Sequence, residues 1–163
     1  MKVAIIFGSR SDTDKMKNAA LCLKEFGIEY KAFVLSAHRV PEHLEKTIKD
    51  IENQNFEVII AGAGLAAHLP GVIASKTILP VIGVPISASV LDGMDALLSI
   101  VQMPKPITVA TVGINNSYNA GMLAVEMLSL KYDSVRNKLI EYRKKMKEDF
   151  ISDNEKPIDF GIY

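Results

Sequence analysis

The sequence predicts an α/β fold in which helices cover both faces of a five-stranded parallel sheet. Short apolar runs rich in Val and Ile alternate along the chain with longer segments of helical periodicity. The runs lack the strict polar alternation of half-buried strands, as is typical of strands buried on both faces. With 163 residues, of which 48% are hydrophobic, the chain is expected to form a single domain around a sizeable core.

Each apolar run is a predicted strand, and each is followed by a predicted helix. The strands are expected at residues 3–7, 30–35, 58–61, 81–84 and 107–112. The helices are expected at residues 12–26, 41–53, 66–75, 91–101 and 116–130. Pro41 suits the first turn of its helix, and Gly27 suits the end of the helix before it. Right-handed crossovers between parallel strands then distribute the helices over both faces of the sheet.

The charge balance predicts a small partner. The 19 basic residues equal the 19 acidic ones, so the chain has no net field to hold nucleic acid or an anionic membrane. A local basic pocket for one phosphate remains compatible with this balance. The single cysteine, Cys22, recurs at helical spacing with Met16, Ala19 and Phe26, which favours a buried small hydrophobe over a reactive thiol.

The N-terminal segment gives no sign of secretion. Met1 and Lys2 lead directly into an apolar run of five residues, which is too short for the core of a signal peptide. The apolar runs also fall short of the roughly 18 residues that a membrane span requires. We therefore expect a cytoplasmic protein that does not enter membranes.

The first chemical motif is Gly-Ser-Arg-Ser-Asp at residues 8–12, between the first strand and its helix. Ligands of such folds bind outside the carboxyl ends of the strands, where this loop lies. Gly8 allows a tight turn, and the hydroxyls of Ser9 and Ser11 with free backbone N–H groups could hold a phosphate. The alternative is simple N-capping by Ser11 or Asp12. The motif matches neither the Walker pattern nor the dinucleotide fingerprint, so a nucleoside triphosphate or NAD is not indicated.

The second motif, Ser-Ala-His-Arg-Val-Pro at residues 36–41, follows the second strand. Arg39 offers a planar fork of donors that suits a phosphate monoester. His38 is the residue type that exchanges protons near neutral pH. The alternative is a surface arginine beside a structural histidine. The serine loop is expected on the neighbouring strand, which favours a functional role for Arg39 and His38.

The third motif follows the third strand and has four small residues, Ala-Gly-Ala-Gly at 61–64, and then His68. Small residues let the backbone approach a ligand closely, although close packing of strand against helix explains them equally. A single histidine such as His68 is more often a satisfied core residue than a ligand. No metal is expected, because His38 and His68 lack a second ligand three or four residues away. His43 falls within a predicted helix and is expected to face solvent.

Taken together, the motifs resemble a known family, the N5-carboxyaminoimidazole ribonucleotide mutases of bacterial purine biosynthesis. The resemblance spans nearly the whole chain in the same order and rests on residues 8–12, 36–41, 61–71, 83–85 and 99–104. It implies a flavodoxin-like three-layer α/β/α sandwich with an extra C-terminal helix. It also implies an isomerase that forms a homo-octamer and uses no metal, nucleotide or organic cofactor.

The reaction implied by the resemblance moves a carboxylate from the exocyclic nitrogen of the ribonucleotide to C4 of the imidazole, giving 4-carboxy-5-aminoimidazole ribonucleotide. His38 matches the catalytic position and would serve first as general acid and then as general base. Ser9, Ser11 and Arg39 match phosphate ligands, and Asp12 matches a ribose ligand. The substrate-binding set implied by the resemblance is Gly8, Ser9, Ser11, Asp12, Ser36, Arg39, Ala63, Gly64, His68 and Leu69. Of these, the last four match the part of the family's site that encloses the migrating carboxylate.

Three features depart from the usual family pattern. Leu65 stands where glycine is usual, so we expect the backbone there to take a conformation that a side chain tolerates. Pro106 replaces a more flexible sequence, and residues 115–121 follow the family only loosely. These departures concern the loops and leave the chemistry unchanged.

Three other functions are compatible with this fold. A sister branch carboxylates aminoimidazole ribonucleotide with free carbon dioxide, but it typically lacks the His-Leu-Pro-Gly segment found here at 68–71 and has Lys in place of Arg39. A flavodoxin-like FMN-binding protein or a phospho-signalling module is a more distant alternative. The lack of tryptophan and of an acidic cluster at the strand ends weighs against both.

The C-terminal segment has an apolar stripe at spacings of three and four. The stripe comprises Val135, Leu139, Tyr142, Met146 and Phe150. The predicted sandwich is complete without it, so the stripe either folds back on its own domain or covers another subunit. The resemblance favours the second arrangement. We therefore expect a catalytic domain at 1–131, a helix packing on a neighbouring subunit at 132–151 and an extended tail at 152–163.

Overall fold

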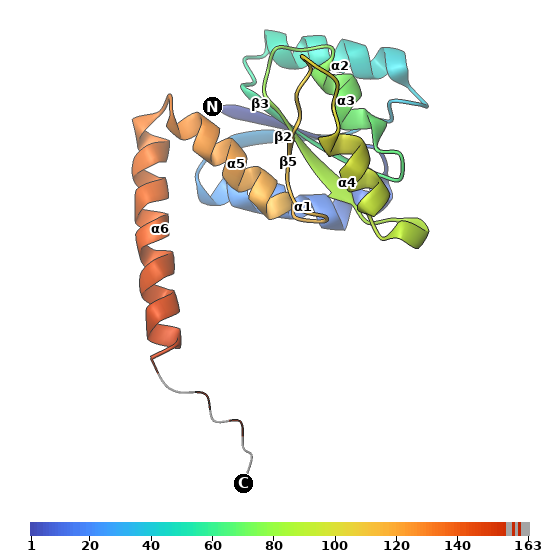
Figure 1. The fold of residues 1–163 in the computed structure, drawn as a ribbon. Helices are drawn as coiled ribbons and strands as arrows, with labels where there is room; N and C mark the ends of the chain where they lie inside the picture. The colour runs from blue at the N-terminus through green and yellow to red at the C-terminus, as the bar shows by residue number, and fades with distance from the viewer. Residues whose placement is uncertain (156–157, 159, 161–163) are drawn as a thin grey trace.

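The computed structural model describes residues 1–155, 158 and 160, and its core is a parallel sheet (Figure 1). Within the described residues the sheet has five strands in the order β2-β1-β3-β4-β5, and every neighbouring pair is parallel. The strands are β1 (Lys2–Phe7), β2 (Glu29–Val34), β3 (Val58–Gly64), β4 (Val81–Ile86) and β5 (Ala110–Thr111). The predicted fold class, a flavodoxin-like three-layer sandwich, is confirmed.

Helices cover both faces of the sheet (Figure 1). They are α1 (Thr13–Glu25), α2 (Pro41–Asn53), α3 (His68–Ala74), α4 (Met94–Val101), α5 (Ser117–Ser129), α6 (Asp133–Asp153) and the short 3₁₀ turns η1 (Arg10–Asp12) and η2 (Ser89–Leu91). One core cluster joins the sheet to α1 and α5, and a second joins it to α2, α3 and α4. Among the described residues, none of these helices combines the length and apolar character needed to cross a bilayer.

Local sequence explains several helix ends. α2 begins at Pro41 and ends at Asn53, as predicted. After α1 the chain turns at Gly27, whose φ of 73° lies in the left-handed region, and the N–H of Ile28 donates to the carbonyl oxygen of Leu23 over 2.9 Å. Cys22 on α1 is completely buried, and burial, followed by the charge of Glu25, raises the pKa of its thiol to about 12. The interpretation of Cys22 as a buried small hydrophobe is confirmed.

Two predicted strands differ from the structure. β2 was expected to be buried on both faces, but it lies at the edge of the sheet and its side chains are mostly exposed. That expectation was wrong, because an apolar run does not distinguish an edge strand from a central one. β5 keeps only Ala110 and Thr111 of the predicted run. At the start of the run, the N–H of Ile107 donates instead to the carbonyl oxygen of Pro104 over 3.0 Å, in a turn that precedes the strand.

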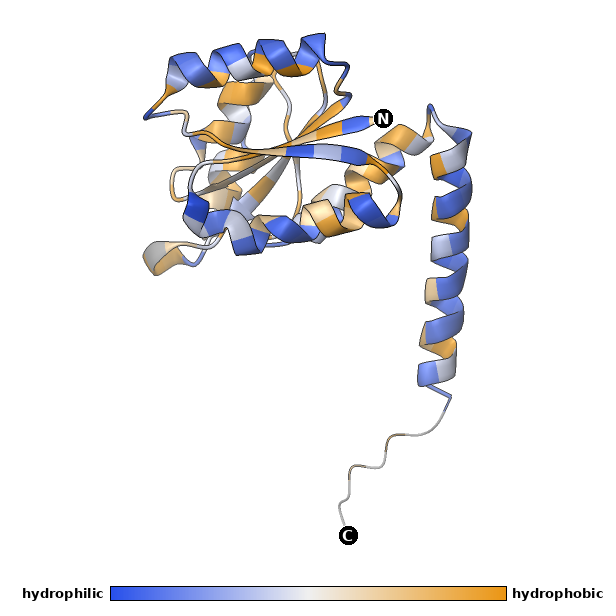
Figure 2. Ribbon diagram, turned by 180° about the vertical axis from the view of Figure 1, so that it is seen from behind, coloured by the Kyte–Doolittle hydropathy of each residue, from blue (hydrophilic) through white to orange (hydrophobic). Residues whose placement is uncertain are grey.

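α6 packs on its own domain at one end and extends away from it at the other (Figure 1). Near its start, Val135 is 1% exposed and belongs to the same core cluster as α1 and α5, with Leu139 and Tyr142 packed against that cluster. Farther along, Met146 is 52% exposed and Phe150 is 70% exposed. Figure 2 shows hydrophobic positions recurring along this projecting helix, whereas α2 keeps a mostly hydrophilic outer face. One end of the apolar stripe is thus buried in the core of its own domain, and the other end is exposed.

The C-terminal boundaries differ slightly from the prediction. α6 ends at Asp153, so it includes the first two positions of the predicted tail at 152–163. Half of that tail, at 156–157, 159 and 161–163, lies outside the described residues.

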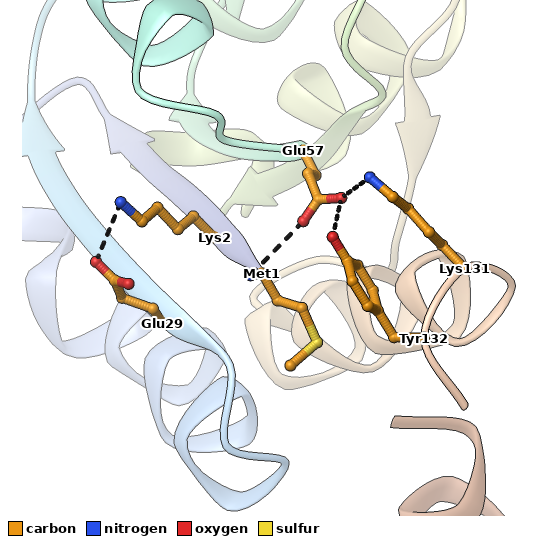
Figure 3. Close-up of polar contacts among 6 residues, drawn as sticks. All are labelled: Met1, Lys2, Glu29, Glu57, Lys131 and Tyr132. Carbon is orange, nitrogen blue, oxygen red and sulfur yellow. Dashed lines mark hydrogen bonds and ion pairs between the residues drawn. The ribbon is translucent and has the colours of Figure 1, made fainter. Parts of the chain in front are cut away.

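The junction between α5 and α6 is anchored on Glu57, which precedes β3 (Figure 3). The Nζ of Lys131 lies 2.7 Å and the hydroxyl of Tyr132 lies 2.8 Å from Oε1 of Glu57, while the amino group of Met1 lies 3.8 Å from Oε2. Burial by itself would raise the pKa of Glu57, but the hydrogen bonds and charge from Lys131 and Tyr132 outweigh it, and the pKa is lowered. Ionised Glu57 therefore fixes where α6 leaves the domain.

Candidate active site

A cavity of about 500 Å³ opens at the carboxyl edge of the sheet. Its walls come from the segments that follow β1, β2, β3 and β4. Chain connections run to opposite faces of the sheet on either side of the β1–β3 pair, and open α/β sheets bind ligands at such a switch point. A volume of this size suits a small organic ligand.

Every site residue named from the sequence lies in the wall of this cavity. They are Gly8, Ser9, Ser11, Asp12, Ser36, His38, Arg39, Ala63, Gly64, His68 and Leu69. Ala88, just beyond β4, also lines the cavity and was not singled out from the sequence. Its position after a strand was the available signal, but a small apolar side chain gives no chemical indication of a site.

The serine loop forms a compact group of polar side chains. The Oγ of Ser11 donates to the Oγ of Ser9 over 2.9 Å and also lies 3.3 Å from Oδ1 of Asp12. Asp12 occupies the N-cap position of α1, as the capping alternative proposed, but its side chain makes no capping hydrogen bond there. At the start of η1 it is the side chain of Ser9 that accepts from the backbone. A Cβ added at Gly8 would meet none of the described atoms within 4 Å. There is therefore open space beside Gly8 in this loop.

Arg39 connects the loops that follow β1 and β2. Its Nη2 donates to the carbonyl oxygen of Gly8 over 2.9 Å. The turn that carries it is closed by the N–H of Val40 donating to the carbonyl oxygen of Ser36, and the Oγ of Ser36 accepts from the N–H of Arg39. The structure thus brings the serine loop and Arg39 together, as the order of the strands predicted.

The two motif histidines contact each other directly. Nε2 of His38 lies 2.6 Å from Nδ1 of His68, and the rings meet edge to face with centroids 4.8 Å apart and planes at 75°. One nitrogen of the pair must carry the shared hydrogen while the other accepts it. The sequence predicted that both histidines follow strand ends, but their contact was not predicted.

The small residues of β3 serve two purposes. A Cβ on Gly62 would collide with the end of the Met16 side chain from α1, so Gly62 gives that side chain room to pack against β3. A Cβ on Gly64 would lie 3.0 Å from the carbonyl oxygen of Ile86 and 3.3 Å from Cβ of Ala88. Gly64 also lines the cavity. The packing explanation is therefore supported at Gly62, and the close approach of a ligand to Gly64 stays a prediction.

The backbone at Leu65 differs from the expectation. Leu65 has a φ of 56°, in the left-handed region that a side chain tolerates poorly, and Ala67 has a φ of 42°. The expected side-chain-tolerant conformation was wrong, because the tight turn from β3 into α3 requires left-handed residues whatever side chain is present. His68 is the first residue of α3, so this turn sets its position against His38.

The polar groups around the cavity indicate what it can do. A guanidinium, paired hydroxyls and a carboxylate suit a phosphorylated sugar, and the imidazole pair suits proton transfer. In the described part of the chain there is no grouping of three or more His, Cys, Asp or Glu side chains placed to hold a metal ion. The fold and the site together are typical of an α/β enzyme, and the polar groups of the site suit a small phosphorylated ligand.

Comparison with known proteins gives the family. The model of the AIR carboxylase family matches residues 2–149, and the chain belongs to this family, which confirms the resemblance seen in the motifs. N5-carboxyaminoimidazole ribonucleotide mutase of Pyrococcus abyssi is 56% identical over 90% of this chain and 84% of its own. The enzyme of the same name from Thermotoga maritima is 53% identical over 92% of this chain and 88% of its own. The crystal structure of Treponema denticola PurE superposes with a TM-score of 0.87 and 29% identity, over 94% of this chain and 96% of that one.

Proposed function

We propose that this chain is an isomerase that converts N5-carboxyaminoimidazole ribonucleotide into 4-carboxy-5-aminoimidazole ribonucleotide in purine biosynthesis. The observation that carries the proposal is the position of His38, which lies in the cavity wall beside Arg39 and in contact with His68. The names of the 56% and 53% identical relatives support the same activity. The cavity supplies groups for each part of this substrate.

The phosphate is assigned to the serine loop and Arg39. The hydroxyls of Ser9 and Ser11 already lie together, and Arg39 has donors beyond the one that contacts Gly8. Charge-assisted hydrogen bonds to phosphate are the strongest that such a site can make. Asp12, next to Ser11, would accept from the ribose hydroxyls. The phosphate and ribose would then occupy the side of the cavity next to β1.

His38 is assigned both proton transfers. Protonated His38 gives its proton to the exocyclic nitrogen as the nitrogen–carboxylate bond breaks, and carbon dioxide is released within the cavity. C4 of the ring then attacks carbon dioxide and forms the new carbon–carbon bond. His38, now neutral, removes the proton from C4 and returns to its starting state. One residue therefore balances the protons over the whole reaction.

The segment that follows β3 is assigned the task of retaining carbon dioxide. Ala63 and Leu69 are buried, and Gly64 and His68 lie in the same wall. An apolar wall excludes water and limits escape of the released gas. Leu69 also belongs to the core cluster beneath α2, α3 and α4, so the wall rests on packed side chains.

A second candidate is direct carboxylation of aminoimidazole ribonucleotide by free carbon dioxide, which the description of the family model favours. Purified protein should be assayed with each ribonucleotide separately. We expect turnover of the carboxyamino substrate without added bicarbonate. Turnover confined to aminoimidazole ribonucleotide with bicarbonate would assign the carboxylase instead, and a yellow purified protein would point to a bound flavin.

We further infer that the enzyme is a cytoplasmic homo-octamer with a catalytic domain at 1–131 and a helix at 132–151 that packs on a neighbouring subunit. The exposed side chains of Met146 and Phe150 support this arrangement, because they continue an apolar stripe whose other end is buried. A helix that projects from its own domain can reach a second copy (Figure 1).

A further inference from the structure

The loop after β4 is held by side chains from two distant elements, and the point of attachment is Ser87. Oδ1 of Asn115 accepts from the N–H of Ser87 over 2.9 Å, and Nδ2 of Asn115 donates to the Oγ of Ser87 over 2.7 Å. From α1, the Nζ of Lys15 donates to the carbonyl oxygen of Ser87 over 2.5 Å. Both backbone polar groups of Ser87 are therefore fixed by side chains.

Asn115 is itself firmly positioned. Its N–H donates to the carbonyl oxygen of Pro85 over 2.8 Å, beyond the point where β5 ends. Its φ of 59° lies in the left-handed region, which asparagine adopts more readily than most residues. On the other side, the hydroxyl of buried Ser117 donates to the carbonyl oxygen of Lys15. Asn115 and Lys15 thus clamp Ser87 from two well-anchored segments.

The clamp acts on the cavity through the residue after Ser87. Ala88 lines the cavity and faces Gly64, where an added Cβ would come within 3.3 Å of Cβ of Ala88. The ends of β3 and β4 therefore lie close together beside the cavity. A shift of Ser87 would displace Ala88, which follows it in the chain, and would disturb the close approach of Ala88 to Gly64 in the part of the wall assigned to the migrating carboxylate.

We propose that Asn115 is a positioning residue for the reaction, an inference that rests on the proposed function. Asn115 acts through Ser87 to keep Ala88 against Gly64, and so keeps the cavity closed to the loss of carbon dioxide. Lys15 supports the same contact from α1. Neither Asn115 nor Lys15 belongs to the cavity wall, so the effect on the reaction is indirect.

The test compares three substitutions. Asn115→Gly removes both side-chain contacts and keeps the left-handed backbone without strain. Asn115→Asp keeps an acceptor for the N–H of Ser87, and the hydroxyl of Ser87 can turn to donate to it. Asn116→Gly is the matched control, because Asn116 caps α5 through the N–H of Asn119 and its replacement by glycine costs little.

Two measurements are made on each variant. In the mutase assay, Asn115→Gly should lower kcat by about 10- to 100-fold, the effect of a small displacement in a reactive site. It should also release more carbon dioxide for each product formed. Asn115→Asp and Asn116→Gly should stay within about 3-fold of the parent in both quantities, a difference of under 1 kcal/mol. Equal losses in Asn115→Gly and Asn116→Gly, or an unchanged ratio of carbon dioxide to product, would overturn the positioning role.

Hydrogen exchange tests the clamp independently of the reaction. Mass spectrometry should show faster exchange at the amide of Ser87 in Asn115→Gly, and parent-like exchange in Asn115→Asp and Asn116→Gly. Unchanged exchange in Asn115→Gly would refute the clamp. If the parent protein is inactive on the carboxyamino substrate while this exchange pattern holds, the proposed function fails, the reaction-positioning role fails with it, and the clamp on the loop stands as a structural finding.

Discussion

Nε2 of His38 and Nδ1 of His68 lie 2.6 Å apart, so the two motif histidines form one hydrogen-bonded pair. The pair joins the turn after β2 to the first residue of α3. When His38 carries the shared hydrogen, His68 accepts it and holds the His38 ring in place. We therefore expect His38 to transfer protons and His68 to orient the His38 ring.

Replacing His38 should abolish turnover while preserving binding. His38→Asn keeps a polar side chain of similar reach but removes the group that gives and takes protons. We expect kcat to fall by about 10²- to 10⁴-fold, the usual contribution of a general acid–base residue, with little change in KM. A spectroscopic assay of the ribonucleotide reaction measures both constants. A kcat close to that of the parent would exclude His38 as the proton carrier.

Replacing His68 should have a smaller effect than replacing His38. His68→Asn removes the imidazole that orients His38 but leaves the proton-transferring ring in place. We expect a fall in kcat of about 10-fold, which corresponds to about 1.4 kcal/mol of lost orientation. The two variants should be assayed side by side at the same pH. A larger loss in His68→Asn than in His38→Asn would exchange the roles of the two histidines.

Arg39 should govern binding of the phosphate. Arg39→Ala removes charge-assisted hydrogen bonds that contribute about 1.5–3 kcal/mol, so KM should rise by about 10- to 100-fold. Arg39→Lys keeps the charge but loses the planar fork and should recover only part of the affinity. Arg10→Ala is the matched control, because Arg10 lies in η1 outside the cavity wall. If KM is unchanged in Arg39→Ala, the phosphate binds elsewhere.

Glu57 should make stability depend on pH. Its pKa is lowered in the folded chain from the usual 4.5, so its stabilising contribution is present above 4.5 and is lost as pH falls through the lowered value. Glu57→Gln should therefore lower the thermal midpoint at pH 7, and its difference from the parent should shrink below pH 4.5.

The control for Glu57 is Glu29→Gln. Glu29 lies 3.8 Å from Lys2 in a more exposed ion pair, which should contribute little at either pH (Figure 3). Thermal unfolding at the two pH values measures both variants. A Glu57→Gln deficit that is equally large at pH 7 and at pH 3.5 would show that the charge of Glu57 is not its cause.

The exposed end of α6 should be required for assembly. Truncation after Lys131 would also remove Val135, which is buried in the protein's own core, so a point substitution is a sharper test. Phe150→Ser should lower the oligomer mass seen by light scattering and lower activity with it. Lys147→Ser, on the same helix, should leave both unchanged. An intact octamer in Phe150→Ser would refute the role given to this surface.

The fold was predictable because each apolar run is followed by a helical segment, and this order determines a parallel sheet with little ambiguity. The exposure of β2 could not be predicted, since the sequence of a strand does not show whether the strand lies at the edge of the sheet. Residues with distinctive chemistry, such as His38 and Arg39, identified the cavity because they follow strands. The His38–His68 contact, the left-handed φ of Leu65 and the clamp by Asn115 depend on how loops meet in space. Local sequence carries no direct signal for those relationships.

The most direct test of the central claim follows the carboxylate itself. Carboxyamino substrate labelled with ¹³C in the carboxylate should be converted by the purified protein in a buffer that contains unlabelled bicarbonate. If carbon dioxide is held in the cavity between its release and its recapture, the label will be retained in the product, as seen by mass spectrometry. A product whose carboxylate carries the unlabelled carbon of the buffer would contradict the account.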